Sequence, residues 1–185
     1  GEARDTDDSE GEIVETSQIR PSRHEIDKVL SKFTGEISQI PPKYSALKVN
    51  GQRAYALARV NKPVTLESRK IRIDSLLLVD NDEETACFDV ICGKGTYIRA
   101  LARDIARCLG TFGHVSTLCR TAVGPFTENT AISLDIVESL VHSARLAAHV
   151  LPVEAPLADI PALELTESDA HRLRCGQVIA VKDAD

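Results

Sequence analysis

The chain lacks paired cysteines and long apolar runs, and these absences exclude several classes of protein. Its five cysteines are odd in number and include no C-x-x-C pair, which argues against a zinc site and indicates a reducing, cytoplasmic setting with buried thiols. Cys92 and Cys108 fall on apolar faces, where we expect a structural role. No apolar run approaches the length of a membrane span, and no dinucleotide motif is present. A hydrophobic content of 43% is still enough for a core, and 185 residues suggest one domain with a small appendage.

Metal binding is also disfavoured at the acidic opening of the chain. Residues 5–11, DTDDSEG, are similar to a calcium loop, but Glu10 stands at the position that requires glycine. Thr16 stands where such a loop needs its final glutamate. The sequence therefore predicts no calcium site.

Charge is distributed unevenly along the chain, whose formal net charge is −6. Residues 1–42 hold 5 Lys/Arg against 10 Asp/Glu, residues 43–120 hold 13 against 8, and residues 121–185 hold 4 against 10. Phosphate binding depends on local basic patches rather than on total charge. Arg99, Arg103 and Arg107 recur every four residues and share one helical face, where like charges repel unless something anionic meets them. This stripe predicts contact with RNA, the alternative being a solvated helix face.

A short run, Cys92-Gly-Lys-Gly-Thr-Tyr-Ile-Arg99, joins a strand pattern to a helix pattern. Alternation over 88–92 predicts a mostly buried strand, and apolar residues from Ile98 to Leu109 recur at helical spacing. Two glycines permit a sharp turn. Tyr97 and Arg99 then emerge together, and an aromatic ring beside a guanidinium suits a flipped base with its phosphate, or a buried carboxylate. The alternative is a Gly-rich turn with a core tyrosine.

A second run spans residues 39–59, QIPPKYSALKVNGQRAYALAR. Its two prolines predict an extended entry, residues 44–49 a strand, Asn50-Gly51 a turn and residues 53–59 a helix. Together with residues 92–99, this run resembles the bacterial TruB family of tRNA pseudouridine synthases, with its PP-x-YSA-x-K, NG-x-x-x-Y-x-x-AR and KGTYIR segments. Residues 113–126, GHVSTLCRTAVGPF, are similar to the family's LRRT-x-VG-x-F stretch, and residues 5–11 to its TDT-x-D-x-x-G stretch. The four runs occur in the family's order over residues 1–126.

The resemblance implies isomerisation of uridine to pseudouridine in the T-loop of tRNA, with the target base flipped out of its stack. The reaction is redox-neutral, so it implies no cofactor and no metal. By resemblance, Tyr97 stacks on the uracil and assists proton removal, and Arg99 pairs with a catalytic aspartate and keeps it ionised. Leu118 gives the base an apolar wall, although Leu118 and Tyr44 could equally be core residues and Arg99 part of a surface ion pair. The residues expected to bind substrate or RNA are Tyr44, Lys48, Lys94, Arg103, Arg107, Leu118 and Arg120. The expected partner is the tRNA T-arm stem-loop. We expect the full-length protein to bind it as a monomer and not to associate with a membrane.

The sequence departs from the family in two places. Cys119 stands where many members have the first of two arginines. The G-x-LDP-type motif with the family's catalytic aspartate does not occur in these residues, so we expect the chain to be part of a longer protein and inactive alone. A non-catalytic RNA-hairpin-binding module is the alternative function. A third hypothesis, a small-molecule enzyme using Lys94 or a cysteine, requires a base beside the thiol, and no histidine is patterned near a cysteine.

The expected fold is α+β, a mainly antiparallel mixed sheet with flanking helices. We expect a catalytic domain over 1–150, a proline-marked linker over 151–162, and the start of a small PUA-like β domain over 163–185. In the first part of the chain we expect a helix from Ser22 to Gly35, a strand or strand pair over 63–80 with Ile71, Ile73 and Leu76 to Val79 as core, and its hairpin partner over 85–92. A helix over 97–109 that ends at Gly110 and a strand region over 114–126 should follow. The last expected elements are a helix from Ser133 to Ala147, with Ile136, Leu140 and Val141 inward, and a short helix after Thr166. An exposed sheet edge and apolar face predict that the isolated polypeptide associates with itself.

Overall fold

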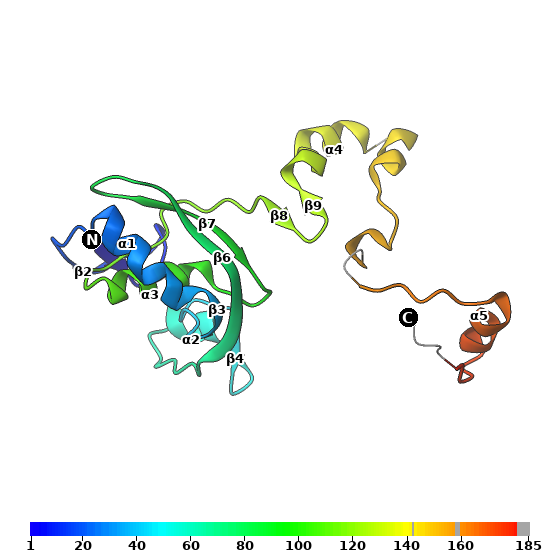
Figure 1. Cartoon of the computed structure of the whole chain (residues 1–185), viewed down its shortest axis with the longest axis horizontal. Coiled ribbons are helices and arrows are strands. Elements are labelled where there is room, and N and C mark those ends of the chain that lie inside the picture. The colour runs from blue at the N-terminus through cyan, green and yellow to red at the C-terminus, as the bar shows by residue number, and fades with distance from the viewer. Residues whose placement is uncertain (142, 158–159, 181–185) are drawn as a thin grey trace. The chain divides into compact units, whose positions relative to one another are not determined.

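The computed structural model describes residues 1–141, 143–157 and 160–180, and the chain divides into two compact units, Gly1–Leu118 and Cys119–Asp185 (Figure 1). The first unit contains β1 (Glu2–Arg4), β2 (Ile13–Thr16), α1 (Arg23–Leu30), β3 (Gly35–Gln39), β4 (Lys48–Val49), β5 (Gln52–Arg53), α2 (Ala54–Arg59), β6 (Arg69–Asn81), β7 (Ala86–Cys92) and α3 (Ile98–Cys108), with a 3₁₀ turn at Ser31–Phe33. The second contains β8 (Ala122–Val123), β9 (Phe126–Thr127), α4 (Leu134–Leu140), α5 (Glu167–Arg174) and 3₁₀ turns at Glu128–Thr130, Ala144–His149 and Ala155–Leu157.

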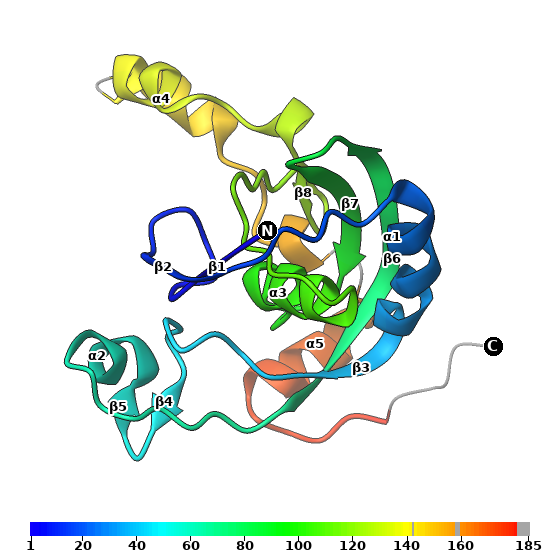
Figure 2. The ribbon, with the colours of Figure 1, turned by 90° about the vertical axis from the view of Figure 1, so that its left-hand side faces the viewer.

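The first unit is built on a three-stranded antiparallel sheet of order β3-β6-β7. Helices α1 and α3 cover one face of this sheet (Figure 2). The core between them consists of buried aliphatic side chains: Ile26 and Leu30 of α1, Ile71, Ile73, Leu76 and Leu78 of β6, and Leu101 and Ile105 of α3. The α+β class and the β6–β7 hairpin expected from the sequence are confirmed.

Strand β6 changes the parity of its buried residues part-way along. Ile71 and Ile73 are buried in its first half and Leu76 and Leu78 in its second, and the pairing with β7 shifts between Ile73 and Ser75. This β-bulge places one extra residue in the strand, so both halves direct their apolar side chains to the same face. The expectation that Leu76 to Val79 are all core is therefore wrong for Leu77 and Val79, which are 59% and 58% exposed.

The outer face of the sheet carries Leu77, Val79 and Ile91, each more than half exposed. It is the apolar face that the sequence leads us to expect, and self-association of the isolated polypeptide through it stays a prediction.

Local capping explains where the two core helices begin and end. Ser22 caps α1 and forms the expected capping box with Glu25, whose carboxylate accepts from the Ser22 N–H at 2.8 Å. Helix α1 ends at Leu30, earlier than expected, because the chain tightens into the 3₁₀ turn and Gly35 then opens β3. Helix α3 ends at Cys108, followed by Gly110 at φ 74°, which confirms the predicted cap.

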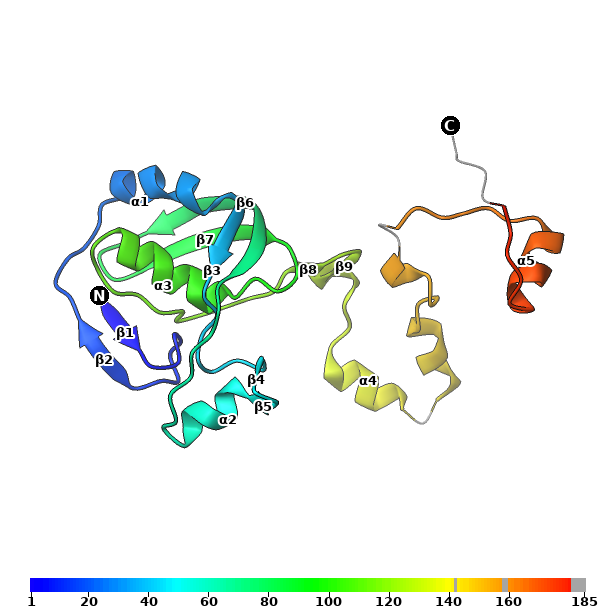
Figure 3. The same ribbon diagram turned by 90° about the horizontal axis from the view of Figure 1, so that it is seen from below.

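The segment after the prolines forms a short hairpin followed by a helix, and its first strand is shorter than expected. Only Lys48–Val49 of the strand expected over 44–49 pairs, with Gln52–Arg53. Asn50 and Gly51 have φ of 50° and 81°, the left-handed pair that a tight two-residue hairpin turn requires. Helix α2 follows, and Figure 3 shows β4, β5 and α2 lying apart from the three-stranded sheet.

The second unit has less regular structure than expected. Within the strand region expected over 114–126, the described strands are β8, at Ala122–Val123, and the first residue of β9, Phe126. Val115 makes an isolated bridge to Asp8 within the first unit. Ser133 caps α4 as expected, but the helix ends at Leu140, and Ile136 and Val141 are 45% and 52% exposed rather than inward. Thr166 caps α5, as expected. The domain boundaries at 150 and 163 stay predictions, and residues 181–185 lie outside the described part.

The cysteines differ from expectation. All five are free thiols, but Cys87, Cys108, Cys119 and Cys175 are exposed, and only Cys92 packs against the core. Among the described residues, no helix is long and apolar enough to cross a membrane.

Candidate active site at the start of α3

The turn before α3 fixes where the helix begins. Gly95 has φ 86°, a left-handed conformation that glycine adopts without strain, and the Gly93 N–H donates to the Arg72 carbonyl at 2.8 Å. Tyr97 is the N-cap, with extended backbone and no side-chain cap. The turn expected from the two glycines is therefore present, and it places Tyr97 and Arg99 together at the start of the helix.

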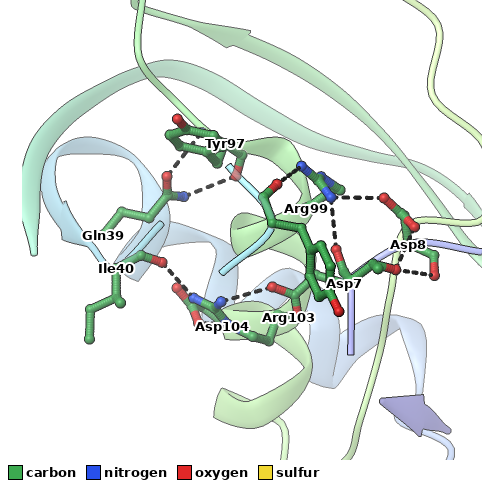
Figure 4. A network of polar contacts seen from close by, with 10 residues as sticks. Asp7, Asp8, Gln39, Ile40, Tyr97, Arg99, Arg103 and Asp104 are labelled. Carbon is green, nitrogen blue, oxygen red and sulfur yellow. Dashed lines mark hydrogen bonds and ion pairs between the residues drawn. The ribbon is translucent and has the colours of Figure 1, made fainter. Parts of the chain in front are cut away.

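Gln39, at the end of β3, binds the backbone of Tyr97 from the other side (Figure 4). The Tyr97 N–H donates to Gln39 Oε1 at 2.9 Å, and Gln39 Nε2 donates to the Tyr97 carbonyl at 3.2 Å. Gln39 is only 2% exposed. Both polar ends of a buried amide are thus satisfied by one residue that lies 58 positions away.

Arg99 is held by three acceptors from two distant segments. Its Nη1 donates to the Thr6 carbonyl and to Asp8 Oδ2, both at 2.9 Å, and its Nη2 donates to the Tyr44 carbonyl at 2.8 Å. The side chains of Arg99 and Asp8 are 26% and 24% exposed. A guanidinium has five N–H groups, and the described residues accept from three of them, which leaves Nε–H and one Nη2–H for a further acceptor.

Arg103, one turn further along α3, makes a second and more deeply buried cluster. It donates to Asp7 Oδ2 at 2.9 Å, to the Ile40 carbonyl at 2.8 Å and to Asp104 Oδ1 at 2.9 Å. The side chains of Arg103 and Asp7 are each 13% exposed. Asp7 has φ 61°, a left-handed conformation that aspartate tolerates better than most residues.

The two aspartates have opposite pKa shifts. Burial by itself raises the pKa of Asp8, but hydrogen bonds from Thr6 Oγ1 and the Glu10 N–H, together with Arg99, outweigh burial and hold the pKa below its ordinary value. Asp8 is therefore a stable carboxylate.

At Asp7, burial raises the pKa, and the charge and hydrogen bond of Arg103 oppose that rise. Burial alone lowers the pKa of Arg103, but Asp104 and Asp7 outweigh it and raise the pKa, so the guanidinium stays protonated.

Tyr44 contributes more than its carbonyl. Its hydroxyl donates to Asp5 Oδ2 at 3.3 Å, and desolvation and the nearby Asp5 carboxylate raise the pKa of the phenol. The segment of residues 39–44 and the acidic loop of residues 5–8 therefore meet at the first two turns of α3.

The structure brings together some of the sequence-predicted site residues and not others. Tyr44, Tyr97, Arg99 and Arg103 lie in this cluster. Lys48, Lys94 and Arg107 are exposed on the first unit, Leu118 is 58% exposed, and Arg120 is exposed on the second unit. The anion that meets Arg99 and Arg103 is provided by the chain's own Asp8 and Asp7.

Sequence reasoning missed the partners: Asp7, Asp8, Asp104 and Gln39. Charge patterning contained a signal, because the acidic excess of residues 1–42 complements the basic excess of residues 43–120. Gln39 has no such signal beyond its place before the two prolines. Within the described ranges, no three His, Cys, Asp or Glu residues are grouped as a metal site.

One sequence expectation about thiols is wrong. His171 Nε2 lies 3.8 Å from Cys175 Sγ at the end of α5, so a histidine does neighbour a cysteine. The pair is exposed and belongs to the second unit, whereas the α3 cluster belongs to the first.

Comparison with known families decides the assignment. A family model described as "TruB family pseudouridylate synthase (N terminal domain)" matches residues 1–98, and one described as "tRNA pseudouridylate synthase B C-terminal domain" matches residues 99–158. The chain belongs to the TruB family. The resemblance seen in the sequence is thereby confirmed.

Similar proteins extend this TruB assignment over the whole chain. A tRNA pseudouridine synthase B of Rhodospirillum rubrum is 53% identical over 98% of this chain and 59% of its own length. One of Bradyrhizobium diazoefficiens is 52% identical over all of this chain and 55% of its own length. The chain thus spans somewhat more than half of these relatives. Among solved structures, a chain of a "Cbf5-Nop10-Gar1 Complex" aligns with TM-score 0.57 and 26% identity, over 75% of this chain and 40% of that chain.

Proposed function

We propose that this TruB chain is part of a tRNA pseudouridine synthase that isomerises uridine in the T-loop of tRNA. The N1–C1′ bond of the nucleotide breaks, the uracil turns, and a C5–C1′ bond forms to the same ribose. The C5 hydrogen leaves as a proton and N1 ends protonated, so the reaction balances without an oxidant. Family membership supports the proposed activity, and the position of Tyr97 and Arg99 together at the start of α3 supports the roles proposed for these two residues.

Arg99 has the geometry for its proposed role. Asp8 and two carbonyls fix its guanidinium, and two N–H groups remain for the carboxylate that attacks the nucleotide. A guanidinium beside that carboxylate lowers its pKa and keeps it ionised at neutral pH. Because the fork is held before substrate arrives, no reorganisation is needed during the reaction.

Tyr97 is proposed to stack on the flipped uracil and to assist removal of the C5 proton. It is half-buried at the N-cap of α3, where its backbone is bonded to Gln39. Leu118 is proposed as the apolar wall, and Lys48, Lys94, Arg107 and Arg120, all exposed, as phosphate contacts. The proposed partner is the T-arm stem-loop, bound by a monomer. The five free thiols support a cytoplasmic location.

Release of tritium from C5 tests the activity. The intact protein that carries this chain is mixed with a T-arm hairpin labelled with tritium at uracil C5, and hairpin binding is measured in parallel by filter retention. We expect release from the wild type and a loss of about 10²- to 10⁴-fold for Tyr97→Phe and Arg99→Lys. Tyr55→Phe and Arg72→Lys, which change exposed side chains outside the cluster, are the matched controls.

Three results separate the hypotheses. Release that depends on Tyr97 and Arg99 supports the synthase. Tight, salt-sensitive hairpin binding without release supports the RNA-binding module instead, since phosphate contacts weaken steeply with salt. Neither release nor binding rejects both functions.

A further inference from the structure

Gln39 is the most completely buried polar side chain of the α3 cluster, and every polar atom of its amide is committed to Tyr97. Oε1 accepts from the Tyr97 N–H and Nε2 donates to the Tyr97 carbonyl, so the amide pairs with both polar groups of one residue (Figure 4). Gln39 is 2% exposed, so these bonds are shielded from bulk water. A buried amide that loses such partners costs free energy, so this geometry is maintained.

The backbone of Tyr97 needs a partner from outside α3, because the helix provides a hydrogen bond to its carbonyl but none to its N–H. As the N-cap of α3, Tyr97 accepts from the Leu101 N–H at 3.0 Å through its carbonyl, but its own N–H points out of the helix. The preceding turn contains Gly95 in a left-handed conformation and adds no strand ladder. Gln39 is thus the partner that the described structure gives to the Tyr97 N–H.

The segment that follows Gln39 continues the same support. The Ile40 carbonyl accepts from Arg103, and the Tyr44 carbonyl accepts from Arg99. Between them, Pro42 is fully buried and has its φ fixed by its ring. Residues 39–44 therefore hold the start of α3 at three successive points, and Gln39 is the one directed to Tyr97.

We propose that Gln39 is a positioning residue for uridine isomerisation, which fixes the Tyr97 backbone and thereby the direction of the Tyr97 ring. This inference rests on the proposed function. Because Gln39 is only 2% exposed, we expect it to act on the chemical step through Tyr97 and not on RNA affinity. A misplacement of about 1 Å in a reacting group can cost about 100-fold in rate. Loss of the hydrogen bonds between Gln39 and the Tyr97 backbone should therefore have a measurable effect on the reaction rate.

The test uses the intact protein and separates rate from binding. Gln39→Met keeps the side-chain length and removes both hydrogen bonds, and Gln39→Asn keeps the amide but shortens it by one methylene. Gln52→Met makes the same chemical change at an exposed position on β5 and is the matched control. Single-turnover tritium release at saturating enzyme gives the rate of the chemical step, and filter retention gives the Kd for the T-arm hairpin.

We expect the single-turnover rate to fall about 100-fold for Gln39→Met and about tenfold for Gln39→Asn, with the Kd within twofold of wild type in both. If Gln39→Met does not fold, as judged by circular dichroism and thermal melting, Gln39→Asn alone carries the test. Rates within twofold of Gln52→Met in a folded variant overturn the positioning role while leaving the synthase intact. A weakened Kd with an unchanged single-turnover rate also overturns it. Absence of release from the wild type rejects the proposed function and this inference with it.

Discussion

Replacement of Arg103 by methionine removes a guanidinium that donates to Asp7, Asp104 and the Ile40 carbonyl. Methionine fills similar space, so the main loss is electrostatic. Asp7 is left 13% exposed with its cation gone. Breaking a buried pair on one side costs about 3–5 kcal/mol, and the remaining exposure places this pair at the lower end, about 3 kcal/mol.

The assay is urea unfolding of the intact protein, with Lys70→Met as the matched control. Lys70 pairs with Glu36 at 3.1 Å, but the two side chains are 70% and 69% exposed, so its loss costs about 0–1 kcal/mol. Raising the salt concentration to 0.5 M should remove most of the Lys70 effect and little of the Arg103 effect, because salt screens exposed charges.

A second variant checks the cause. Asp7→Asn added to Arg103→Met removes the stranded carboxylate, and asparagine tolerates the left-handed backbone of position 7. We expect the double variant to be more stable than Arg103→Met alone by about 1–2 kcal/mol. An Arg103→Met protein within 1 kcal/mol of wild type, or a double variant less stable than the single, would refute the electrostatic account.

Three further changes have expected outcomes. Asp8→Asn should lower the free energy of unfolding at neutral pH. In urea melts at several pH values, the difference in unfolding free energy from wild type should shrink as pH falls below about 4, because a carboxylate whose pKa is lowered by folding stabilises the protein above its unfolded pKa and loses this effect as it is protonated. A difference that does not change with pH contradicts this. Ser22→Ala should cost about 1 kcal/mol in the same melts through loss of the α1 capping box, and no change would show that the box is dispensable. Ile73→Ala should cost about 2–5 kcal/mol because the side chain is fully buried, whereas Leu77→Ala, on the outer face, should change unfolding by less than about 1 kcal/mol; equal costs would argue against the assigned faces of β6.

Local signals in the sequence predict much of the first unit. The capping box of α1, the hairpin of β6 and β7, and the glycine that ends α3 each depend on neighbouring residues, and all were predicted correctly. Strand β3 was missed because GEISQ shows little alternation of apolar and polar residues. Residues 44–47 and most of 114–126 have strand-like composition but find no neighbouring strand, and composition alone does not create a partner.

For a similar reason, the sequence predicts two residues of the candidate site but not the residues that they bind. Tyr97 and Arg99 stand together in the sequence, so their proximity follows from the helix start. Their partners do not, since Gln39 is 58 positions from Tyr97 and Asp8 is 91 from Arg99. A stripe of like charges indicates that an anion meets it, but the sequence favours RNA as readily as the chain's own acidic loop. Only the fold distinguishes the two.

These long separations have a consequence for the order in which the first unit is assembled during synthesis. Asp7 and Asp8 leave the ribosome before the arginines that they bind, which follow 96 and 91 residues later. Closing a free loop of that length costs about 4 kcal/mol in chain entropy, before any constant term. We expect the β6–β7 hairpin and the helices packed on it to form earlier and shorten that loop, with the ion pairs as the last contacts to close. We therefore expect a newly made chain to reach a folded core before the α3 cluster of ion pairs forms.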